Sequence, residues 1–354
     1  MTIIPARLIY TLFSLGVFMR AVVVDAPGGP EAARVREVDS PTPALGEVLI
    51  RVAACGMCGH DQADRMGLTK APLPGILGHE IAGTVVALGD CVRHVTVGDR
   101  VAVKQFSYCG RCRDCFAGRD VDCAFRAFTY GGYAELVAVP EVAVLPVPEH
   151  VALTDAAVAA CALGSCVQAL DGIARLRSGE TVVVTGAGGG LGLHGLQAAK
   201  ARGATVIAVT SSAAKTGVLT AADHVVVADG DWWPQILELT NGRGAEVVLD
   251  NVGHPAVFRQ AFRGLARRGR YVFTGQVSDA PIRVHPAFLF EKEAVITGSA
   301  STTMASFAEA MALIANGQVT PVTTHYSLED AATAFVDLDA RRVGGRIVLV
   351  PETS

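Results

Sequence analysis

The chain has 354 residues, which at about 150 residues per domain predicts roughly two domains. Hydrophobic residues make up 51% and charged residues 18%, so the chain can bury a large core and wholesale disorder is excluded. The net charge of −4 argues against a nucleic-acid partner, which needs a basic excess, and the odd count of nine cysteines argues against a secreted scaffold built only from disulfides.

The N-terminus contains an apolar run, residues 8–19, that is too short for a membrane span of about 20 residues. It is not followed by the small residues of a signal-peptide cleavage site. We therefore interpret residues 1–18 as an extension or a start-site artefact, with Met19 as the working start; a targeting peptide is the alternative. With no other span predicted, we expect a cytoplasmic protein without a membrane partner.

The first 150 residues contain short β-type runs that glycines and prolines separate, which is typical of an irregular, strand-rich domain. The predicted strands are residues 19–24, 48–52, 83–88, 100–103 and 134–139.

The pattern changes near residue 148, where two alanine-rich helices precede an apolar strand, residues 181–185. This strand has no polar alternation, as expected of a strand buried on both faces of a parallel sheet. Strands and helices then alternate, which predicts a doubly wound parallel sheet. The predicted helices are 154–162, 167–174, 191–202, 304–316 and 328–338, and the further strands are 205–210, 224–227, 246–250, 271–275, 295–298 and 346–350.

Four cysteines follow the spacing C-x2-C-x2-C-x7-C: Cys109, Cys112, Cys115 and Cys123. Short steps let adjacent thiolates turn toward one centre, and four thiolates complete a closed zinc shell. The sequence therefore predicts a structural zinc lobe, with two disulfides or an iron–sulfur cluster as the alternatives.

A second set of potential ligands consists of Cys58, His79 and Cys161. One histidine and two cysteines leave a fourth position open for substrate or water, which is the composition of a catalytic zinc site. Asp61 and Glu80 are the acids that would orient these ligands. Taken alone, a cysteine such as Cys161 is more often a small core residue than a metal ligand.

A glycine-rich loop lies between the strand at 181–185 and the next helix. Glycines there let backbone N–H groups approach a pyrophosphate at the helix N-terminus, so we expect a dinucleotide site rather than a plain turn. The loop residues are Gly186, Gly188, Gly189, Gly190, Leu191 and Gly192.

The next strand ends at Ser211 and Ser212, with Lys215 shortly after, and no acid occurs between residues 206 and 220. An NAD site usually offers a carboxylate here to the ribose hydroxyls, whereas serines and a lysine suit a 2′-phosphate. We therefore expect NADP(H) in preference to NAD(H); the alternative is that these residues only line a solvated turn.

Three motifs together resemble the zinc-dependent medium-chain dehydrogenase/reductase (alcohol dehydrogenase) family, over residues 19–351. They are Gly78-His79-Glu80-x2-Gly83-x5-Gly89-x2-Val92, the four-cysteine lobe that follows it, and Cys161-Ala162-Leu163-Gly164-Ser165. The resemblance implies an α/β protein with a Rossmann cofactor domain (164–301) and a GroES-like catalytic domain (19–163 and 302–354).

The resemblance also implies two zinc ions per chain. Cys58, His79 and Cys161 would be catalytic ligands, with Glu80 an adjacent or exchangeable ligand, and the four spaced cysteines would hold the structural ion. Further cofactor contacts are expected from Ser165, Asn251, Gly275 and Arg346. The alternative for Arg346 is that it is an ordinary surface arginine. Cys55, Cys91 and Cys166 are left as core thiols.

The activity implied is reversible hydride transfer between an alcohol and an aldehyde or ketone. The family usually relays the alcohol proton through a Ser or Thr two residues after the first cysteine ligand; here that position is His60. His60 would either take the proton itself or only hydrogen-bond to groups around the zinc ligands. Because of this departure, an NADPH-dependent reductase of α,β-unsaturated carbonyls or enoyl-CoA thioesters is the alternative, and a non-enzymatic cofactor-binding protein a remote one. Family members associate through the strand matching 295–298, so a homodimer or homotetramer is expected.

Overall fold

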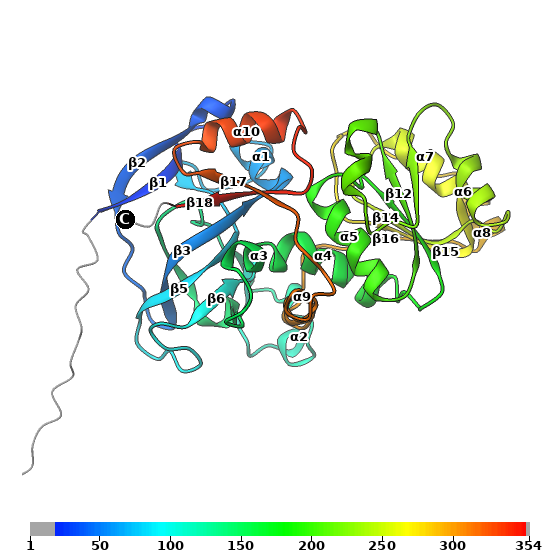
Figure 1. Cartoon of the computed structure of the whole chain (residues 1–354). Coiled ribbons are helices and arrows are strands. Elements are labelled where there is room, and N and C mark those ends of the chain that lie inside the picture. The colour runs from blue at the N-terminus through cyan, green and yellow to red at the C-terminus, as the bar shows by residue number, and fades with distance from the viewer. Residues whose placement is uncertain (1–17, 352–354) are drawn as a thin grey trace, which may run out of the picture.

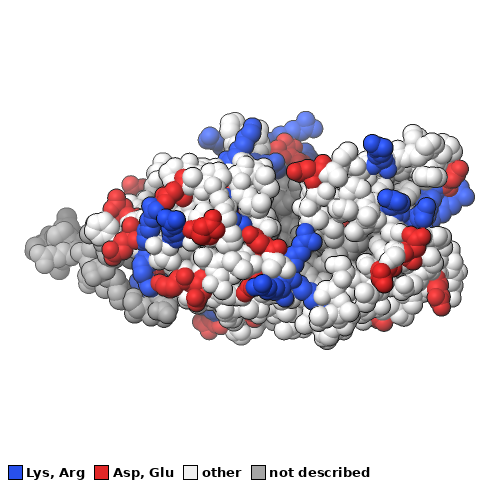
Figure 2. Space-filling model, turned by 90° about the horizontal axis from the view of Figure 1, so that it is seen from above, with Lys and Arg blue, Asp and Glu red and all other residues white. Residues whose placement is uncertain are grey.

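A computed structural model of the chain describes residues 18–351. The predicted N-terminal extension lies outside these residues, except for Phe18. Within residues 18–351, no helix combines the length and the apolar character that crossing a membrane requires. Basic and acidic side chains are interspersed on the face seen in Figure 2.

A six-stranded parallel sheet organises the half of the molecule drawn in green and yellow in Figure 1. Its strand order is β13-β12-β11-β14-β15-β16. The strands are β11 (Thr181–Thr185), β12 (Thr205–Thr210), β13 (His224–Val227), β14 (Ala245–Asp250), β15 (Leu265–Phe273) and β16 (Val295–Gly298). Helices α5 (Gly190–Ala201), α6 (Trp233–Leu239), α7 (Pro255–Arg263) and α8 (Pro286–Lys292) connect or flank them. The predicted doubly wound sheet is confirmed.

Each central strand is buried on both faces, which explains its apolar sequence without alternation. Val182 and Val184 of β11 pack in one hydrophobic cluster with Leu196 of α5, while Val183 packs in another with Phe258 of α7. Burial of both faces is the main source of stability for such a sheet.

The other half contains a seven-stranded, mostly antiparallel sheet with β10, β6, β5, β3, β18 and β17 in order and β9 paired to β3. Its strands are β3 (Glu47–Met57), β5 (Glu80–Leu88), β6 (Arg100–Val103), β9 (Leu136–Pro140), β10 (Val144–Pro146), β17 (Thr323–Ser327) and β18 (Arg346–Val350). A three-stranded sheet joins β1 (Phe18–Val24), β2 (Ala33–Asp39) and β4 (Gly75–Ile76). Strand β18 therefore returns the end of the chain to a sheet formed mainly by its first 150 residues.

A nearly continuous helical run links the two halves. It consists of α3 (Leu153–Ala157), the π-helical segment η4 (Ala159–Leu163), α4 (Gly164–Val167) and the π-helical segment η5 (Gln168–Ile173). The sequence predicted two separate helices here; the structure instead has one run of helical turns, interrupted only at Val158, in which two segments have the wider π-helical turn. Helix α9 (Met304–Ala315) packs against α4 and η4.

A buried ion pair fixes the four-cysteine lobe, which contains α2 (Arg113–Phe116) and η2 (Asp120–Asp122). Lys104 is fully buried, and its Nζ lies 2.6 Å from Asp120 Oδ2. The other carboxylate oxygen of Asp120 accepts a hydrogen bond from Met304 N, 3.1 Å away. One carboxylate thus ties the lobe to both β6 and α9.

Candidate metal and cofactor sites

Cys58, His79, Glu80 and Cys161 come together although they lie on separate segments. One ligand atom from each lies within 4.8 Å of the others. Cys58 follows β3, His79 and Glu80 are at the start of β5, and Cys161 is in the middle of η4. A π-helical turn is a common feature of functional sites, and this one places the Cys161 sulfur beside that of Cys58.

Asp61 orients the ligand atoms of this cluster. Its Oδ2 accepts from Cys58 N (2.8 Å), and its Oδ1 accepts from Gly78 N (3.3 Å) and from His79 Nδ1 (3.1 Å). Nδ1 of His79 therefore carries the proton and donates it to Asp61. The lone pair is then on Nε2, which lies 3.4 Å from Cys58 Sγ. Two sulfurs and an imidazole nitrogen held in this way fit a zinc ion.

The pKa values of the Cys58 and Cys161 thiols shift in opposite directions. The hydrogen bond from Cys161 lowers the pKa of Cys58 well below its usual range, while the same bond and burial raise the pKa of Cys161. Cys58 is therefore the thiol that most readily becomes a thiolate, the form that binds metals.

Glu80 is a buried acid next to these ligands, and burial raises its pKa to about 7. Arg346 opposes this shift, with Nη2 3.2 Å from Glu80 Oε1. Neither Glu80 oxygen has a hydrogen-bond partner among the described residues. Arg346 itself is 5% exposed, so its interpretation as a surface arginine is wrong.

The four cysteines of the lobe also form one cluster, with all four sulfurs within 4.8 Å of one another. The Sγ–Sγ distances are 3.9 Å for Cys109–Cys115 and 3.4 Å for Cys112–Cys115. These are far longer than a disulfide bond and close to the edge of a zinc–thiolate tetrahedron, about 3.8 Å for Zn–S bonds of about 2.3 Å. All nine cysteines are free thiols, and Cys55 and Cys166 are buried as predicted; Cys91 is exposed, so its prediction as a core thiol is wrong.

An aromatic wall covers the cluster on one side. The ring of Phe128 lies 4.9 Å from that of His60, with which it stacks, and 4.8 Å from that of His79. Phe106 and Tyr130 contact Phe128 in turn. These residues lie on or beside the ribbon of β7 (Phe106–Ser107) and β8 (Ala127–Phe128), which the sequence did not predict as strands.

His60 lies in the first turn of α1 (Gly59–Arg65), with 45% of its side chain exposed. Its Nε2 is 3.4 Å from Oδ1 of Asp64, whose side chain is fully buried. Burial raises the pKa of Asp64, and the contact with His60 opposes that shift. Sequence reasoning missed Asp64; its spacing of four residues from His60 on a helix is the signal that pointed to it.

The glycine-rich loop closes tightly between β11 and α5. Gly186 has a φ of +59°, and a Cβ on Gly192 would lie 2.3 Å from Gly186 O, so both positions require glycine. Gly189 is the N-cap of the twelve-residue helix α5 and offers no side-chain cap, which leaves its first N–H groups free for an anion. A Cβ on Gly190 would contact the guanidinium of Arg346.

The other expected cofactor residues surround this loop. Asn251 Nδ2 donates to Thr185 O (2.9 Å), and Gly275 packs on the Asn251 backbone. Ser211 and Ser212 follow the end of β12. Ser165 is buried on α4.

The sequence predicted that Lys215 binds a phosphate, but in the structure its ammonium group already has a partner. Its Nζ donates to Val343 O (2.7 Å), and its alkyl chain covers Gly188.

His194 is a fully buried histidine on α5 that the sequence did not single out. Its Nδ1 lies 2.6 Å from Gly190 O, while Nε2 has no hydrogen-bond partner among the described residues. The pKa of His194 is lowered from 6.5 to about 4, chiefly by burial, with a smaller contribution from the nearby charge of Arg346 and against the opposing effect of the hydrogen bond to Gly190 O. His194 is therefore neutral at pH 7, with its proton on Nδ1.

The chain is similar to known proteins in sequence and in structure. The alcohol dehydrogenase GroES-like domain matches residues 44–149, and the zinc-binding dehydrogenase domain matches residues 190–316. An acryloyl-coenzyme A reductase of Metallosphaera sedula is 33% identical over 94% of this chain and 99% of its own. An NAD-dependent alcohol dehydrogenase of Sulfolobus acidocaldarius is 31% identical over 94% and 99%.

Two solved structures extend the likeness to three dimensions. The crystal structure of AibC is 37% identical, with a TM-score of 0.89 and coverage of 96% of this chain and 97% of that one. That of an NAD-dependent alcohol dehydrogenase is 32% identical, with a TM-score of 0.88 and coverage of 94% and 99%.

The buried neutral His194 predicts a loss of stability in acid. Below pH 6.5 the unfolded chain binds a proton at this histidine that the folded chain binds only near pH 4, so stability falls as pH decreases through this window. Between pH 7 and pH 4.5, the free energy of unfolding of His194→Leu should fall by about 2–3 kcal/mol less than that of the wild type. Urea unfolding at both pH values measures it. The exposed His94→Gln should behave as wild type, and equal acid losses in all three proteins would contradict the assignment.

Proposed function

Because the chain belongs to the zinc-type medium-chain dehydrogenase/reductase family, we propose that it is a zinc-dependent alcohol dehydrogenase that interconverts an alcohol with an aldehyde or ketone. The observation that carries this proposal is the convergence of Cys58, His79 and Cys161 beside Glu80, with their ligand atoms within 4.8 Å. Three such donors suit a metal site that keeps a position for substrate.

We assign Cys58, His79 and Cys161 as ligands of a catalytic zinc, with Glu80 as an adjacent or exchangeable ligand. The four lobe cysteines would hold a second, structural zinc, giving two ions per chain. Bound zinc would act as a Lewis acid toward the substrate oxygen, and the nicotinamide would exchange the hydride. The chain's own residues orient the ligands, shape the pocket and handle the proton.

The proton of the alcohol has an acceptor in His60. The ring is half-exposed, so it can pass a proton to solvent. Its Nε2 lies 3.4 Å from Asp64 Oδ1, which orients the ring. Phe128 stacks on the ring and limits its rotation. Phe128 also covers His79, so it would exclude water from the substrate side of the ligands.

For the cofactor we propose NADP(H) rather than NAD(H). The pyrophosphate would lie at the N-terminus of α5, where Arg346 borders Gly190. Ser211, Ser212 and Lys215 would take the 2′-phosphate at the end of β12. For this, the Lys215 ammonium has to exchange the carbonyl of Val343 for the phosphate.

Reduction of α,β-unsaturated carbonyls or enoyl-CoA thioesters is a second candidate. It is favoured by the acryloyl-coenzyme A reductases of Metallosphaera sedula and Sulfurisphaera tokodaii, 33% and 30% identical to this chain. The full set of zinc donors favours alcohol chemistry, because a zinc ion held there would polarise the C=O bond of an aldehyde or ketone.

A homo-oligomer is the expected assembly. Strand β16 is the edge of the parallel sheet and pairs with β15 alone among the described strands. Val295 on β16 and Phe288 and Phe290 on α8 are each more than half exposed. Because an apolar edge strand invites pairing with another strand, a second copy is proposed to cover it as a dimer, alone or within a tetramer.

The activity is tested by metal analysis together with turnover. We expect about two zinc ions per chain and aldehyde reduction that stops when a chelator removes the catalytic ion. Cys161→Ser should lose one ion and nearly all aldehyde turnover. A protein that reduces enones or enoyl-CoA thioesters with the ion removed, and leaves aldehydes unchanged, would establish the second candidate instead.

The cofactor assignment predicts a kcat/KM at least about tenfold higher with NADPH than with NADH. Lys215→Met keeps the alkyl chain over Gly188 but removes the charge, so it should raise KM for NADPH by roughly tenfold and leave that for NADH nearly unchanged. Steady-state kinetics with both cofactors measure this. A large preference for NADH in the wild type would exclude NADP(H).

The role of His60 predicts that His60→Asn lowers turnover on the order of 100-fold while the zinc content stays at the wild-type value. Asparagine keeps a polar side chain against Phe128 but carries no exchangeable proton acceptor of comparable basicity. Gln62→Ala on the same helix is the control. An unchanged rate in His60→Asn would remove this residue from the proton path.

A further inference from the structure

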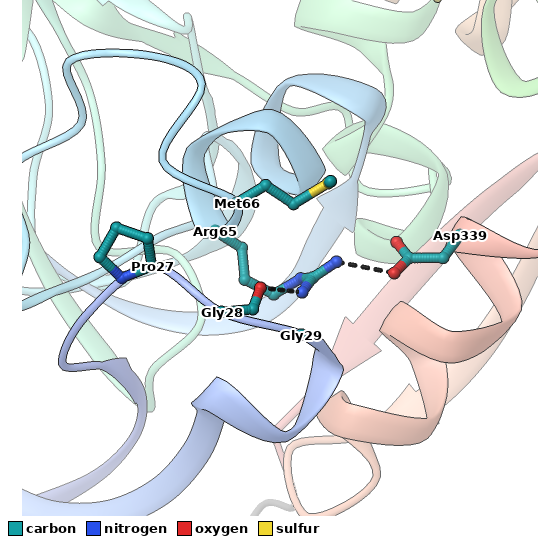
Figure 3. A pocket seen from close by; sticks show the side chains of 6 residues that line it. All are labelled: Pro27, Gly28, Gly29, Arg65, Met66 and Asp339. Atoms are coloured by element: carbon teal, nitrogen blue, oxygen red, sulfur yellow. Dashed lines mark hydrogen bonds and ion pairs between the residues drawn. The ribbon is translucent and has the colours of Figure 1, made fainter.

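A buried arginine anchors the end of α1 that lies away from the proposed metal ligands. The Arg65 side chain is 1% exposed and lies between the β1–β2 loop and helix α10, Ala331–Asp339 (Figure 3). Its Nη1 donates to Gly28 O, and its Nη2 donates to Asp339 Oδ2 at 2.7 Å. The guanidinium also lies over the Phe335 ring, 5.0 Å from its centroid. Arg65 therefore joins three segments that are distant in the sequence.

A cavity of about 340 Å³ borders this ion pair, with Met66, Pro27 and the two glycines of the β1–β2 loop on its walls (Figure 3). Arg65 Nε and Asp339 Oδ1 are buried and lack hydrogen-bond partners among the described residues. A buried guanidinium requires a counter-charge, so the Asp339 contact decides how α1 sits against α10.

The opposite end of α1 carries the chemistry of the proposed metal site. The helix has seven residues, which makes it about 10 Å long. Cys58 is its N-cap, and its first turn holds His60 and Asp61. A helix of two turns moves as a unit, so displacement at Arg65 displaces all three groups.

Asp339 is, in turn, the last residue of α10 and precedes the segment that crosses to the cofactor loop. In that segment, Val343 O accepts from Lys215, and Gly345 N approaches Gly188 O at 3.4 Å. Arg346 then contacts Glu80. Arg65 and Asp339 thus each begin a path through the structure: α1 leads from Arg65 to the proposed metal ligands, and residues 340–346 lead from Asp339 to the glycine-rich loop.

We propose that Arg65 and Asp339 form a positioning pair that transmits cofactor binding at the glycine-rich loop to helix α1. Cofactor bound against the glycine-rich loop holds Gly345 on Gly188 and so fixes the segment after α10, and the ion pair passes that constraint to Cys58 and His60. This inference rests on the proposed cofactor site. The pair touches neither substrate nor cofactor and acts through the helix that it holds.

The test uses hydrogen exchange of the full-length, zinc-loaded protein with and without saturating NADPH. In the wild type, NADPH should slow exchange of residues 59–66 by about fivefold, the lower end of typical coupling between sites. The double variant Arg65→Met with Asp339→Leu removes both charges and fills the space with apolar atoms, which favours retention of the fold. In this variant NADPH should still slow exchange of residues 190–201, but should leave residues 59–66 unchanged.

Arg342→Gln is the matched control, because Arg342 forms an exposed ion pair with Asp337 on the same helix. It should give the wild-type response. Equal protection of residues 59–66 in the wild type and the double variant would overturn the positioning role, as would no protection in the wild type despite NADPH binding. Failure of the wild type to bind NADPH or NADH in a fluorescence titration would instead overturn the proposed function and, with it, this inference.

Discussion

The guanidinium of Arg346 is a positive charge buried between the sheet that contains β18 and the glycine-rich loop, and the arrangement around it follows from that one constraint. A buried charge has to be matched, and Glu80 matches it at 3.2 Å while Met57 O accepts a weaker bond at 3.4 Å. Glu80 is consequently held beside His79 although burial alone disfavours its charge. The glycine-rich loop has to approach the same guanidinium, which leaves no space for a side chain at Gly190. Arg346 therefore sets the distance between the cluster of Cys58, His79, Glu80 and Cys161 and the glycine-rich loop.

The position of Arg346 depends in turn on the register of β18. In this sheet Ile347 pairs with Met57, the residue before Cys58. On the other side of β3, Gly56 pairs with Glu80. A Cβ on Gly56 would collide with the Glu80 carboxylate. The backbone pairing thus brings a cysteine, a histidine, a glutamate and an arginine together before any ligand contributes.

Much of this could be predicted from the sequence because the signals are local. Apolar runs without alternation predicted the parallel sheet, and the cysteine spacing predicted a lobe whose four sulfurs do converge. The ligand cluster was predicted from spacing and family resemblance together. The rest depends on contacts between distant segments: Phe128 against His60, Lys215 on Val343 O, and the π-helical turn at Cys161 all require the folded molecule. Periodicity reports which face of an element is buried, but not which partner covers it.

The interior position of β18 also sets an order of assembly during synthesis. It is made after every other strand of its sheet, yet it lies inside the sheet, between β3 and the edge strand β17. While the chain is still being made, its first half lacks an interior strand and the positive charge of Arg346. The four lobe cysteines, by contrast, lie within fifteen consecutive residues, 109–123, and are available early. The sulfurs of the lobe can therefore converge once residue 123 is made, and the second cluster is complete at Cys161. Arg346 follows much later, so the synthesis of β18 sets the time at which the buried carboxyl of Glu80 gains its counter-charge.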